Sequence, residues 1–289
     1  MYKTIKELTS YAEDMNMTIG AFNTHNLEML PDMIRAAKEA GAPIIIQTSI
    51  DTAKYVGYDV MVAVCKTLAE DEMVDVALHL DHARDFDEIK NAINAGYSSV
   101  MYDGSNLPYK ENIAKTKAIV DFAHARGVSV EGELGTIGGT EEGISVHEKD
   151  KVYTDPKDAI DFVRLTNVDA LAVGIGTNHG QFKSKTEVNI PLLKEIHESV
   201  DVPLVIHGGT GVKEEDYPEL IKNGIRKFNV GTELLVNWTS DAKKSFGDTA
   251  LNKSLRYNVI PANQKAKEIV SHKIKLFMNT DAPIGVKRT

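Results

Sequence analysis

Residues 75–104, DVALHLDHARDFDEIKNAINAGYSSVMYDG, contain the pattern that best indicates the fold class. The stretches DVALHLDH (75–82) and SSVMYDG (98–104) are short apolar runs of the kind that form buried strands. Between them, FDEIKNAINAG (86–96) spaces its apolar residues as a helix does and ends in glycine, the usual helix stop. Because neighbouring parallel strands need a crossover of this length, the stretch predicts a strand–helix–strand unit.

The same unit repeats along the chain in both directions. Further strands are predicted at TIGAFN (18–23), PIIIQTS (43–49), VSVEGELG (128–135), DALAVGIG (169–176), PLVIHGG (203–209) and RKFNVGT (226–232). Helical patterns lie between the strands at residues 27–41, 59–72, 112–127, 156–166, 191–200 and 213–224. Eight strands in alternation with helices predict an α/β fold of the (β/α)8 TIM-barrel type. An open doubly wound sheet is the weaker alternative.

The sequence has no Pro/Ser-rich linker and no block of like charges that would divide it, so we expect a single domain. We place the barrel at about residues 1–247, additional C-terminal helices at about 248–280 and a loose tail at 281–289. LLVNWTSDAKKSF (234–246) and PANQKAKEIVSHKIKLFMN (261–279) predict helices that pack outside the barrel or reach a partner subunit. Because these helices are more than a barrel requires, we expect them to contribute to a homodimer or homotetramer.

The amino-acid composition limits the classes of partner that the protein can be expected to bind. With 33 Lys and Arg against 42 Asp and Glu, the chain carries a formal net charge of −9 at pH 7. Sequence-independent binding to nucleic acid or to an anionic membrane needs positive charge, so we expect neither as a partner. Cys65 is the single cysteine and cannot form an intrachain disulfide, and no apolar run reaches the roughly 18 residues of a membrane span. We expect a soluble, cytoplasmic protein.

Histidines follow three of the predicted strands, at the face where such barrels carry their functional groups. His82 ends the third strand, and the sixth and seventh strands lead to His179 and His207. Three neutral imidazoles converging on one mouth suit Zn²⁺ and leave a fourth coordination position open. One such histidine alone would more often be a polar residue at a core edge, and it is the coincidence of three that predicts a catalytic metal.

Acidic residues stand beside these histidines. Asp81 directly precedes His82, and because side chains alternate along a strand, we expect its carboxylate to face the substrate and act as a general acid or base. Asp103 and Glu133 end the fourth and fifth strands, where they would hold a second cation, tune the first, or cap loops and pair with lysines. No lysine ends a predicted strand, since Lys227 lies before the end of the eighth, which disfavours Schiff-base chemistry.

Glycine-containing turns follow the last two strands, HGGTG at 207–211 and NVGT at 229–232. Glycine lets the backbone approach a ligand, and the helix starts that follow offer free N–H groups, so the two turns predict a phosphate site. One glycine turn is weak support, but these two occupy the places that bind phosphate in this fold. Lys183 would add a charge-assisted contact.

The motifs GAFN (20–23), HLDH (79–82), ELGTIGG followed by EEG (133–143), IGTNHG (175–180), HGGTG and NVGT occur in this order. Together they resemble the class II, metal-dependent ketose-bisphosphate aldolases of the fructose- and tagatose-bisphosphate type. Each motif is weak alone, but the ordered set spans residues 20–232 and is specific. The resemblance implies a zinc-dependent carbon–carbon lyase that acts on a phosphosugar.

The resemblance also implies roles for individual residues. The catalytic zinc ligands would be His82, His179 and His207, with Asp103 and Glu133 at a second divalent or monovalent cation. Asp81 would move the proton of the hydroxyl where the carbon–carbon bond breaks, and Glu141 would shuttle the carbon-bound proton. The residues that would hold the phosphate or line the rest of the pocket are Asn23, Ser49, Gly180, Lys183, Gly208, Gly209, Thr210, Asn229, Val230, Gly231 and Thr232.

Departures from the family pattern bear on the substrate. HGGTG differs from the HGASG of several tagatose-bisphosphate enzymes and favours fructose 1,6-bisphosphate, which would give dihydroxyacetone phosphate and glyceraldehyde 3-phosphate. MYDGS (101–105) and TELLVNWTSDAKKSF (232–246) are similar instead to aldolases that cleave 6-phospho-5-dehydro-2-deoxygluconate. That sugar and tagatose 1,6-bisphosphate stay open as substrates. Remoter alternatives are a metal-dependent hydrolase and a non-catalytic phosphosugar-binding protein.

Overall fold

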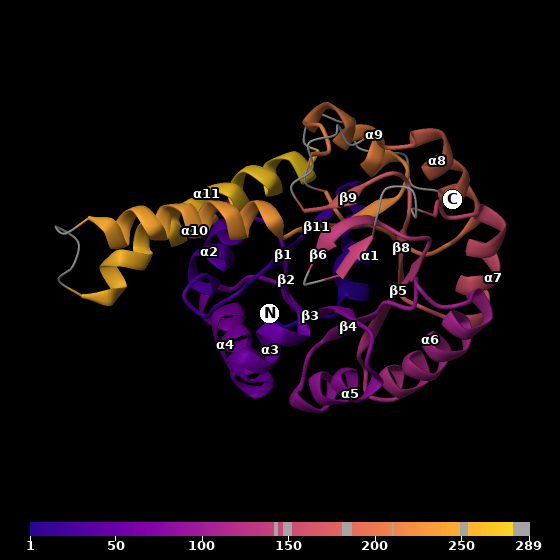
Figure 1. Ribbon diagram of the computed structural model, residues 1–289, viewed down its shortest axis with the longest axis horizontal. Coiled ribbons are helices and arrows are strands. Elements are labelled where there is room, and N and C mark those ends of the chain that lie inside the picture. The colour runs from indigo at the N-terminus through magenta and orange to yellow at the C-terminus, as the bar shows by residue number, and fades with distance from the viewer. Residues whose placement is uncertain (142–143, 147–151, 181–186, 210, 249–253, 280–289) are drawn as a thin grey trace.

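The computed structural model describes residues 1–141, 144–146, 152–180, 187–209, 211–248 and 254–279. Within them, eight parallel strands close into a barrel in the order β1-β11-β10-β8-β5-β4-β3-β2, with helices around it (Figure 1). The barrel strands are β1 (Ile19–Asn23), β2 (Ile44–Thr48), β3 (Val76–Ala83), β4 (Ser99–Tyr102), β5 (Ser129–Leu134), β8 (Ala170–Val173), β10 (Leu204–Ile206) and β11 (Ile225–Val230). The predicted (β/α)8 barrel is confirmed.

Alternate side chains of each strand face opposite sides of the barrel wall. Residues such as Phe22, Ile46 and Leu78 belong to the large core cluster between the strands and the helices. Their neighbours Ala21, Ile45 and Ala77 face the opposite side of the wall and belong to a separate cluster inside the barrel, called the inner cluster below. These residues are small or β-branched because the barrel interior leaves little room.

Helix α1 (Ile5–Asp14) covers one end of this inner cluster. The Thr4 side chain accepts a hydrogen bond from the Glu7 N–H, while the Glu7 carboxylate accepts one from the Thr4 N–H, so a capping box begins the helix. Ile5, Leu8 and Ala12 are buried against the early residues of the barrel strands. Helix α1 was not among the predicted helices, and it closes the amino-terminal end of the barrel.

The outer helices follow the predicted alternation with two local differences. They are α2 (Leu30–Ala40), α3 (Ile50–Val56), α4 (Tyr58–Glu72), α5 (Phe86–Ala95), α6 (Tyr109–His124), α7 (Pro156–Thr166), α8 (Ile190–Ser199) and α9 (Tyr217–Lys222). Helix α3 was not predicted, and Gly57, with φ of 97°, separates it from α4. The helix expected at 213–224 is a 3₁₀ turn (Glu214–Asp216) followed by the short α9, whose first turn accommodates a proline.

A small second sheet lies beyond the carboxyl ends of β5 and β8, where the sequence analysis expected loops. It contains β6 (Gly138–Glu141), β7 (Ile144–Val146) and β9 (Asn178–His179), in the order β7-β6-β9. The barrel strand predicted at 169–176 therefore ends at Val173, and after a turn at Gly176, with φ of 104°, the chain joins this sheet. His179 pairs with Gly139 through the backbone.

Helices α10 (Thr232–Gly247) and α11 (Leu255–Phe277) form a hairpin that projects from the barrel, as Figure 1 shows at the left. The boundary expected near residue 247 falls between the two helices of this hairpin. The Trp238 indole N–H donates to Asn263 Oδ1 at 2.8 Å and joins the two helices. Near the end of α11, Phe277 packs against Tyr217 and Phe228 at centroid distances of 5.5 and 5.0 Å, which fixes the hairpin to the barrel.

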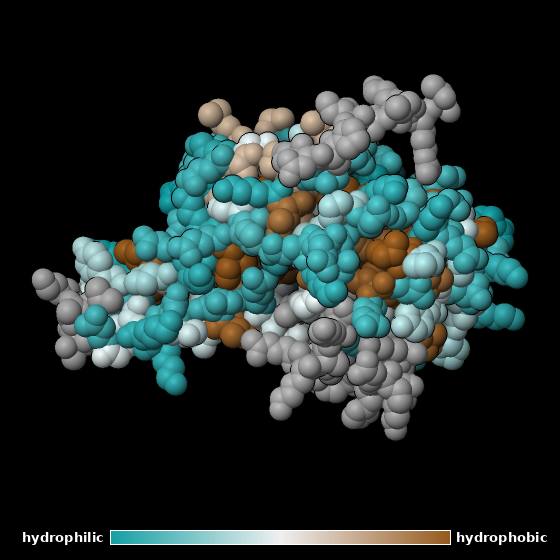
Figure 2. All heavy atoms as spheres, turned by 90° about the horizontal axis from the view of Figure 1, so that it is seen from above, coloured by the Kyte–Doolittle hydropathy of each residue, from teal (hydrophilic) through white to brown (hydrophobic). Residues whose placement is uncertain are grey.

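Hydrophilic side chains cover most of the face shown in Figure 2, with small hydrophobic patches between them. In the described parts of the chain, every helix is too short or too polar to pass through a lipid bilayer.

Candidate active site

Buried polar side chains line the carboxyl-terminal mouth of the barrel, above the apolar inner cluster. Along β3 the inward positions change from Ala77 to His79 and then Asp81, all nearly inaccessible to solvent. His79 Nδ1 lies 3.1 Å from Ser99 Oγ, and burial lowers the pKa of this imidazole to about 3, so it stays neutral. The barrel interior is therefore apolar at its base and polar at its mouth.

Three amide side chains hold the Asp81 carboxylate. Its Oδ2 atom accepts from Asn23 Nδ2 at 3.2 Å and from Gln47 Nε2 at 3.0 Å, and its Oδ1 atom accepts from Asn229 Nδ2 at 3.2 Å. Gln47 Nε2 also lies 2.7 Å from Asn23 Oδ1, and Lys227 Nζ donates to Asn229 Oδ1 at 2.7 Å. Because β1, β2 and β11 each supply a donor, the position of the carboxylate is fixed by the closed barrel.

His82 departs from the alternation of its strand. The residue has φ of 48°, in the left-handed region, and the register between β3 and β4 shifts between Leu80 and Ala83. Such a conformation costs a residue with a Cβ about 1–3 kcal/mol and is a frequent feature of functional sites. Ligand atoms of Asp81, His82 and His207 lie within 4.8 Å of one another, so the departure from alternation leaves both neighbouring side chains at the mouth.

His207 is held from the inside of the barrel by an ion-paired glutamate. Its Nε2 atom lies 2.6 Å from Glu131 Oε1, and Lys227 Nζ lies 2.9 Å from Glu131 Oε2, with all three side chains fully buried. Burial by itself raises the pKa of Glu131, but the Lys227 charge and the His207 hydrogen bond bring it below its usual range. An ionised Glu131 fixes the imidazole orientation and leaves His207 Nδ1 facing His82 Nε2 at 2.8 Å.

Asp103 and Glu133, at the ends of β4 and β5, have different surroundings. Arg84 contacts Asp103 through Nε at 2.8 Å and Nη2 at 2.5 Å, and Ser105 also donates to this carboxylate. Burial would raise the pKa of Asp103, but His82, Ser105 and Arg84 lower it below its usual range. Burial and the Asp103 charge raise the pKa of Glu133 well above its usual value.

The donor set fits a divalent cation. Glu133 Oε2 is buried and has no hydrogen-bond partner among the described residues. It lies 3.8 Å from His207 Nδ1 and 4.0 Å from His82 Nδ1. A cation among these atoms would satisfy the oxygen and separate the two imidazoles, and mixed imidazole and carboxylate ligands suit zinc or a similar ion.

The first of the two predicted phosphate turns requires glycine at two positions. Gly208 has φ of 63°, and a Cβ at Gly209 would come within 2.1 Å of the Phe228 ring. Gly231 is the N-cap of α10 and has no side chain with which to cap the helix, and the N–H groups of such a helix start can bind an anion. The backbone of β11 and the start of α10 bring Asn229, Val230 and Thr232 to the same mouth.

Some sequence-predicted residues lie outside the described residues or differ in role. Lys183 and Thr210 are outside them, as are the side chains of His179 and Glu141, whose backbones belong to β9 and β6. Gly180 directly follows β9 with φ of 83°. Ser49 Oγ accepts from the Thr52 N–H at 3.2 Å and caps α3, a structural role that the sequence did not suggest.

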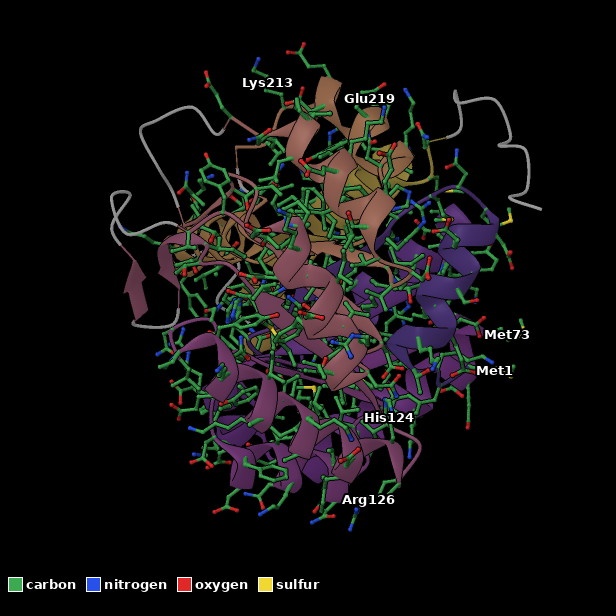
Figure 3. All side chains as sticks on the ribbon, turned by 90° about the vertical axis from the view of Figure 1, so that its right-hand side faces the viewer. Met1, Met73, His124, Arg126, Lys213 and Glu219 are labelled. Atoms are coloured by element: carbon green, nitrogen blue, oxygen red, sulfur yellow. The ribbon has the colours of Figure 1, made fainter. Side chains whose placement is uncertain are left out.

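Three further histidines, His124, His197 and His272, lie on the outer helices α6, α8 and α11. His124, on α6, lies 2.7 Å through Nε2 from Asp169 Oδ2 on the outside of the barrel, near Arg126 (Figure 3). His272 makes a surface contact with Glu214.

Sequence reasoning missed four residues of the site: Gln47, Arg84, Glu131 and Lys227. Gln47, Glu131 and Lys227 each stand two residues before a predicted strand-end residue and so share its inward direction. This two-residue spacing could have identified the three residues as inward-facing members of the site. Arg84 follows β3 and had no such signal.

The comparison with known proteins agrees with this geometry. The model of the family described as fructose-bisphosphate aldolase class-II matches residues 3–282. The chain belongs to this family. It is therefore an aldolase, and its family is metal-dependent as a rule.

Solved structures of aldolases match this class II aldolase over nearly its whole length. The YdjI aldolase of Escherichia coli K12 has a TM-score of 0.84 and 34% sequence identity, and the match covers 96% of this chain and 97% of that one. A putative fructose-1,6-biphosphate aldolase of Coccidioides immitis has a TM-score of 0.84 at 27% identity, covering 94% of both chains. The fructose-bisphosphate aldolase of Campylobacter jejuni, at 20% identity and a TM-score of 0.80 over 96% and 95%, shares the fold.

We predict that Lys227→Met lowers the free energy of unfolding by about 3–5 kcal/mol, because it leaves the buried Glu131 charge without its lysine. Urea denaturation followed by circular dichroism measures the loss. Adding Glu131→Gln should recover part of it, and Lys222→Met, at an exposed position of α9, should change stability by less than about 0.5 kcal/mol. Equal midpoints for the Lys227 and Lys222 variants would contradict the role of the pair.

Proposed function

We propose that this aldolase uses Zn²⁺ to cleave fructose 1,6-bisphosphate into dihydroxyacetone phosphate and glyceraldehyde 3-phosphate. The observation that carries the proposal is the Asp81 carboxylate, held by three amides beside His82 and His207. A fixed, buried base next to a set of residues that would hold a metal suits the removal of a hydroxyl proton from a sugar.

The metal would be held by His82, His207 and His179, with Glu133 close to the first two. When bound, it supplies Lewis-acid polarisation of the substrate carbonyl. Asp81 accepts the proton from the hydroxyl on the carbon whose bond to the ketose half breaks. Asn23, Gln47 and Asn229 keep its carboxylate in one orientation during this transfer. Glu141, on the small sheet, is proposed to move the carbon-bound proton.

The phosphate of the dihydroxyacetone phosphate half is proposed to bind at the two glycine turns. Gly208 and Gly209 let the backbone approach the ligand, and the uncapped start of α10 presents its N–H groups. Lys183 and Thr210 complete this part of the proposal. Such a site holds a dianion in a protein of net charge −9 because it uses local dipoles.

Among the three candidate substrates, we propose fructose 1,6-bisphosphate for two reasons. The HGGTG turn favours it, and the similar protein of Coccidioides immitis is described as a putative fructose-1,6-biphosphate aldolase. Tagatose 1,6-bisphosphate differs from it only in configuration at one carbon. The 6-phospho-5-dehydro-2-deoxygluconate alternative has a different distal end. The same carbon–carbon cleavage would act on all three.

We predict that the purified enzyme releases dihydroxyacetone phosphate fastest from fructose 1,6-bisphosphate, that a chelator abolishes this release and that Zn²⁺ restores it. Coupling to glycerol-3-phosphate dehydrogenase measures the rate with each of the three sugars, and chromatography identifies the aldehyde. Full activity of metal-free enzyme would contradict the mechanism. Release of inorganic phosphate without dihydroxyacetone phosphate would support a hydrolase instead.

We predict that Asp81→Ala lowers kcat by about 10²–10⁴-fold, the usual contribution of a positioned acid or base, while the protein retains its metal. Steady-state kinetics and elemental analysis of the same sample measure both quantities. Asp87→Asn, at an exposed position of α5, serves as the control. Loss of metal from the Asp81 variant in proportion to its activity would make Asp81 a ligand, which its closeness to His82 and His207 permits.

We propose that the chain forms a homodimer or homotetramer through the α10–α11 hairpin. Hydrophobic atoms are visible on the projecting hairpin in Figure 2. Phe246 is 48% exposed and Leu255 68% exposed, which is costly for an arm that stands in water. A second copy of the chain would cover them.

The double variant Phe246→Glu/Leu255→Glu is predicted to sediment as a monomer while the parent protein sediments as an oligomer, because charge in an apolar contact opposes association. Sedimentation velocity compares them, with Tyr55→Glu on α3 as a control for added surface charge. A monomeric parent, or an unchanged oligomer in the double variant, would contradict the assembly.

The proposed location is the cytoplasm. Cys65 is buried and single, and so the fold needs no oxidising compartment.

A further inference from the structure

Arg84 is placed by the barrel directly beside Asp103. It follows β3, two residues after His82, while Asp103 follows β4, the neighbouring strand. The Asp103 N–H donates to the Ala83 carbonyl oxygen at 2.8 Å, so the ends of the two strands are tied together. The contact between Arg84 and Asp103 therefore arises from the strand pairing and does not depend on a long loop.

The Asp103 carboxylate has all of its acceptor positions filled. Its Oδ2 atom accepts from Arg84 Nε at 2.8 Å and Arg84 Nη2 at 2.5 Å. Its Oδ1 atom accepts from the Ser105 N–H at 3.1 Å and from Ser105 Oγ at 2.6 Å. An ionised carboxylate offers about four lone-pair positions, and four donors occupy them. A second cation does not fit at Asp103 while Arg84 is there.

Glu133 differs from Asp103 in this respect. Its buried Oε2 atom has no hydrogen-bond partner among the described residues and faces His82 and His207. It is therefore available to the first cation. The two acids share His82 as a neighbour, but Arg84 pairs with Asp103, while Glu133 Oε2 accepts no hydrogen bond from the described residues.

The charges around the mouth agree with a single divalent ion. The buried acids that line the described part of the mouth are Asp81, Asp103, Glu131 and Glu133. Among the described residues, the arginine and lysine side chains that pair with them are Arg84, with Asp103, and Lys227, with Glu131. Asp103 is already paired with the Arg84 charge, so a second divalent cation at this carboxylate would leave an excess of positive charge in a buried site.

We propose that Arg84 takes the place of a second cation, so that this aldolase binds one metal ion per chain and needs no monovalent activator. The guanidinium is suited to this because it stays charged at all relevant pH values and donates to one carboxylate through two nitrogens. The proposal deepens the proposed function, since it rests on a first cation near His82 and His207.

The test counts metal ions and does not depend on turnover. Metal-stripped parent, Arg84→Ala and Arg84→Gln are each equilibrated with excess Zn²⁺, passed through a desalting column and analysed by inductively coupled plasma mass spectrometry. We expect about one ion per chain in the parent and about two in both variants, because Asp103 regains free lone pairs beside Glu133. Arg84→Lys should stay near one, since it restores the charge.

Arg35→Ala is the matched control, because Arg35 also pairs with a carboxylate, Glu72, at 2.9 Å but lies on the outer surface. Circular dichroism checks that each variant is folded. Two ions per chain in the parent, or one ion in both folded Arg84 variants, would overturn the proposal. Zero ions in the parent would instead contradict the proposed zinc chemistry, so the two failures are distinguishable.

A second measurement tests whether a monovalent cation activates the enzyme. The rate of cleavage is followed as KCl replaces choline chloride at constant ionic strength. The parent rate should stay constant, and that of Arg84→Ala should rise with K⁺ by several-fold or more. A K⁺-dependent parent, or a variant whose only change is a higher KM for the sugar, would show that Arg84 serves the substrate and would overturn the assignment.

Discussion

Each strand of the closed barrel presents only every second side chain to the interior, and the active site depends on this constraint. The inward positions near the amino ends are small and apolar and rest on α1. The inward positions near the carboxyl ends carry amides, acids and one lysine. The Glu131–Lys227 ion pair lies where these two zones meet. Because it is fully buried, it is stable only if both partners are present and bonded further, which Asn229 and His207 provide.

The same pair connects the two chemical centres of the mouth. Through Asn229, Lys227 orients Asp81, and through Glu131 it orients His207. The proposed base and a proposed metal ligand are thus positioned by one network that runs from β11 through β5 to β10. A change at the centre of this network would affect stability and geometry together, and single substitutions within it will not be additive.

His82 shows how the site departs from the rule that builds it. Regular alternation would direct this residue toward the helices, and only the left-handed conformation and the register shift bring it into the mouth. The local cost is offset by the surrounding barrel, which holds both neighbouring strands in place. The shift also brings Arg84 to the edge of the mouth, where it contacts Asp103. This irregularity in β3 therefore positions both His82, a candidate metal ligand, and Arg84, the positive charge beside Asp103.

The architecture and most of the strand-end residues could be predicted from the sequence, because the alternation of strand and helix patterns is local and the carboxyl ends of parallel strands meet at one face. The sequence also placed Asp81, His82 and His207 at that face. The partners of these residues could not be predicted in this way, because they depend on how the barrel closes. Gln47, Glu131 and Lys227 are remote in sequence from the groups they hold, and their contacts exist only when the barrel closes. The conformation of His82 and the capture of Asp103 by Arg84 depend on how β3 pairs with β4, and this register is set by packing across the whole barrel.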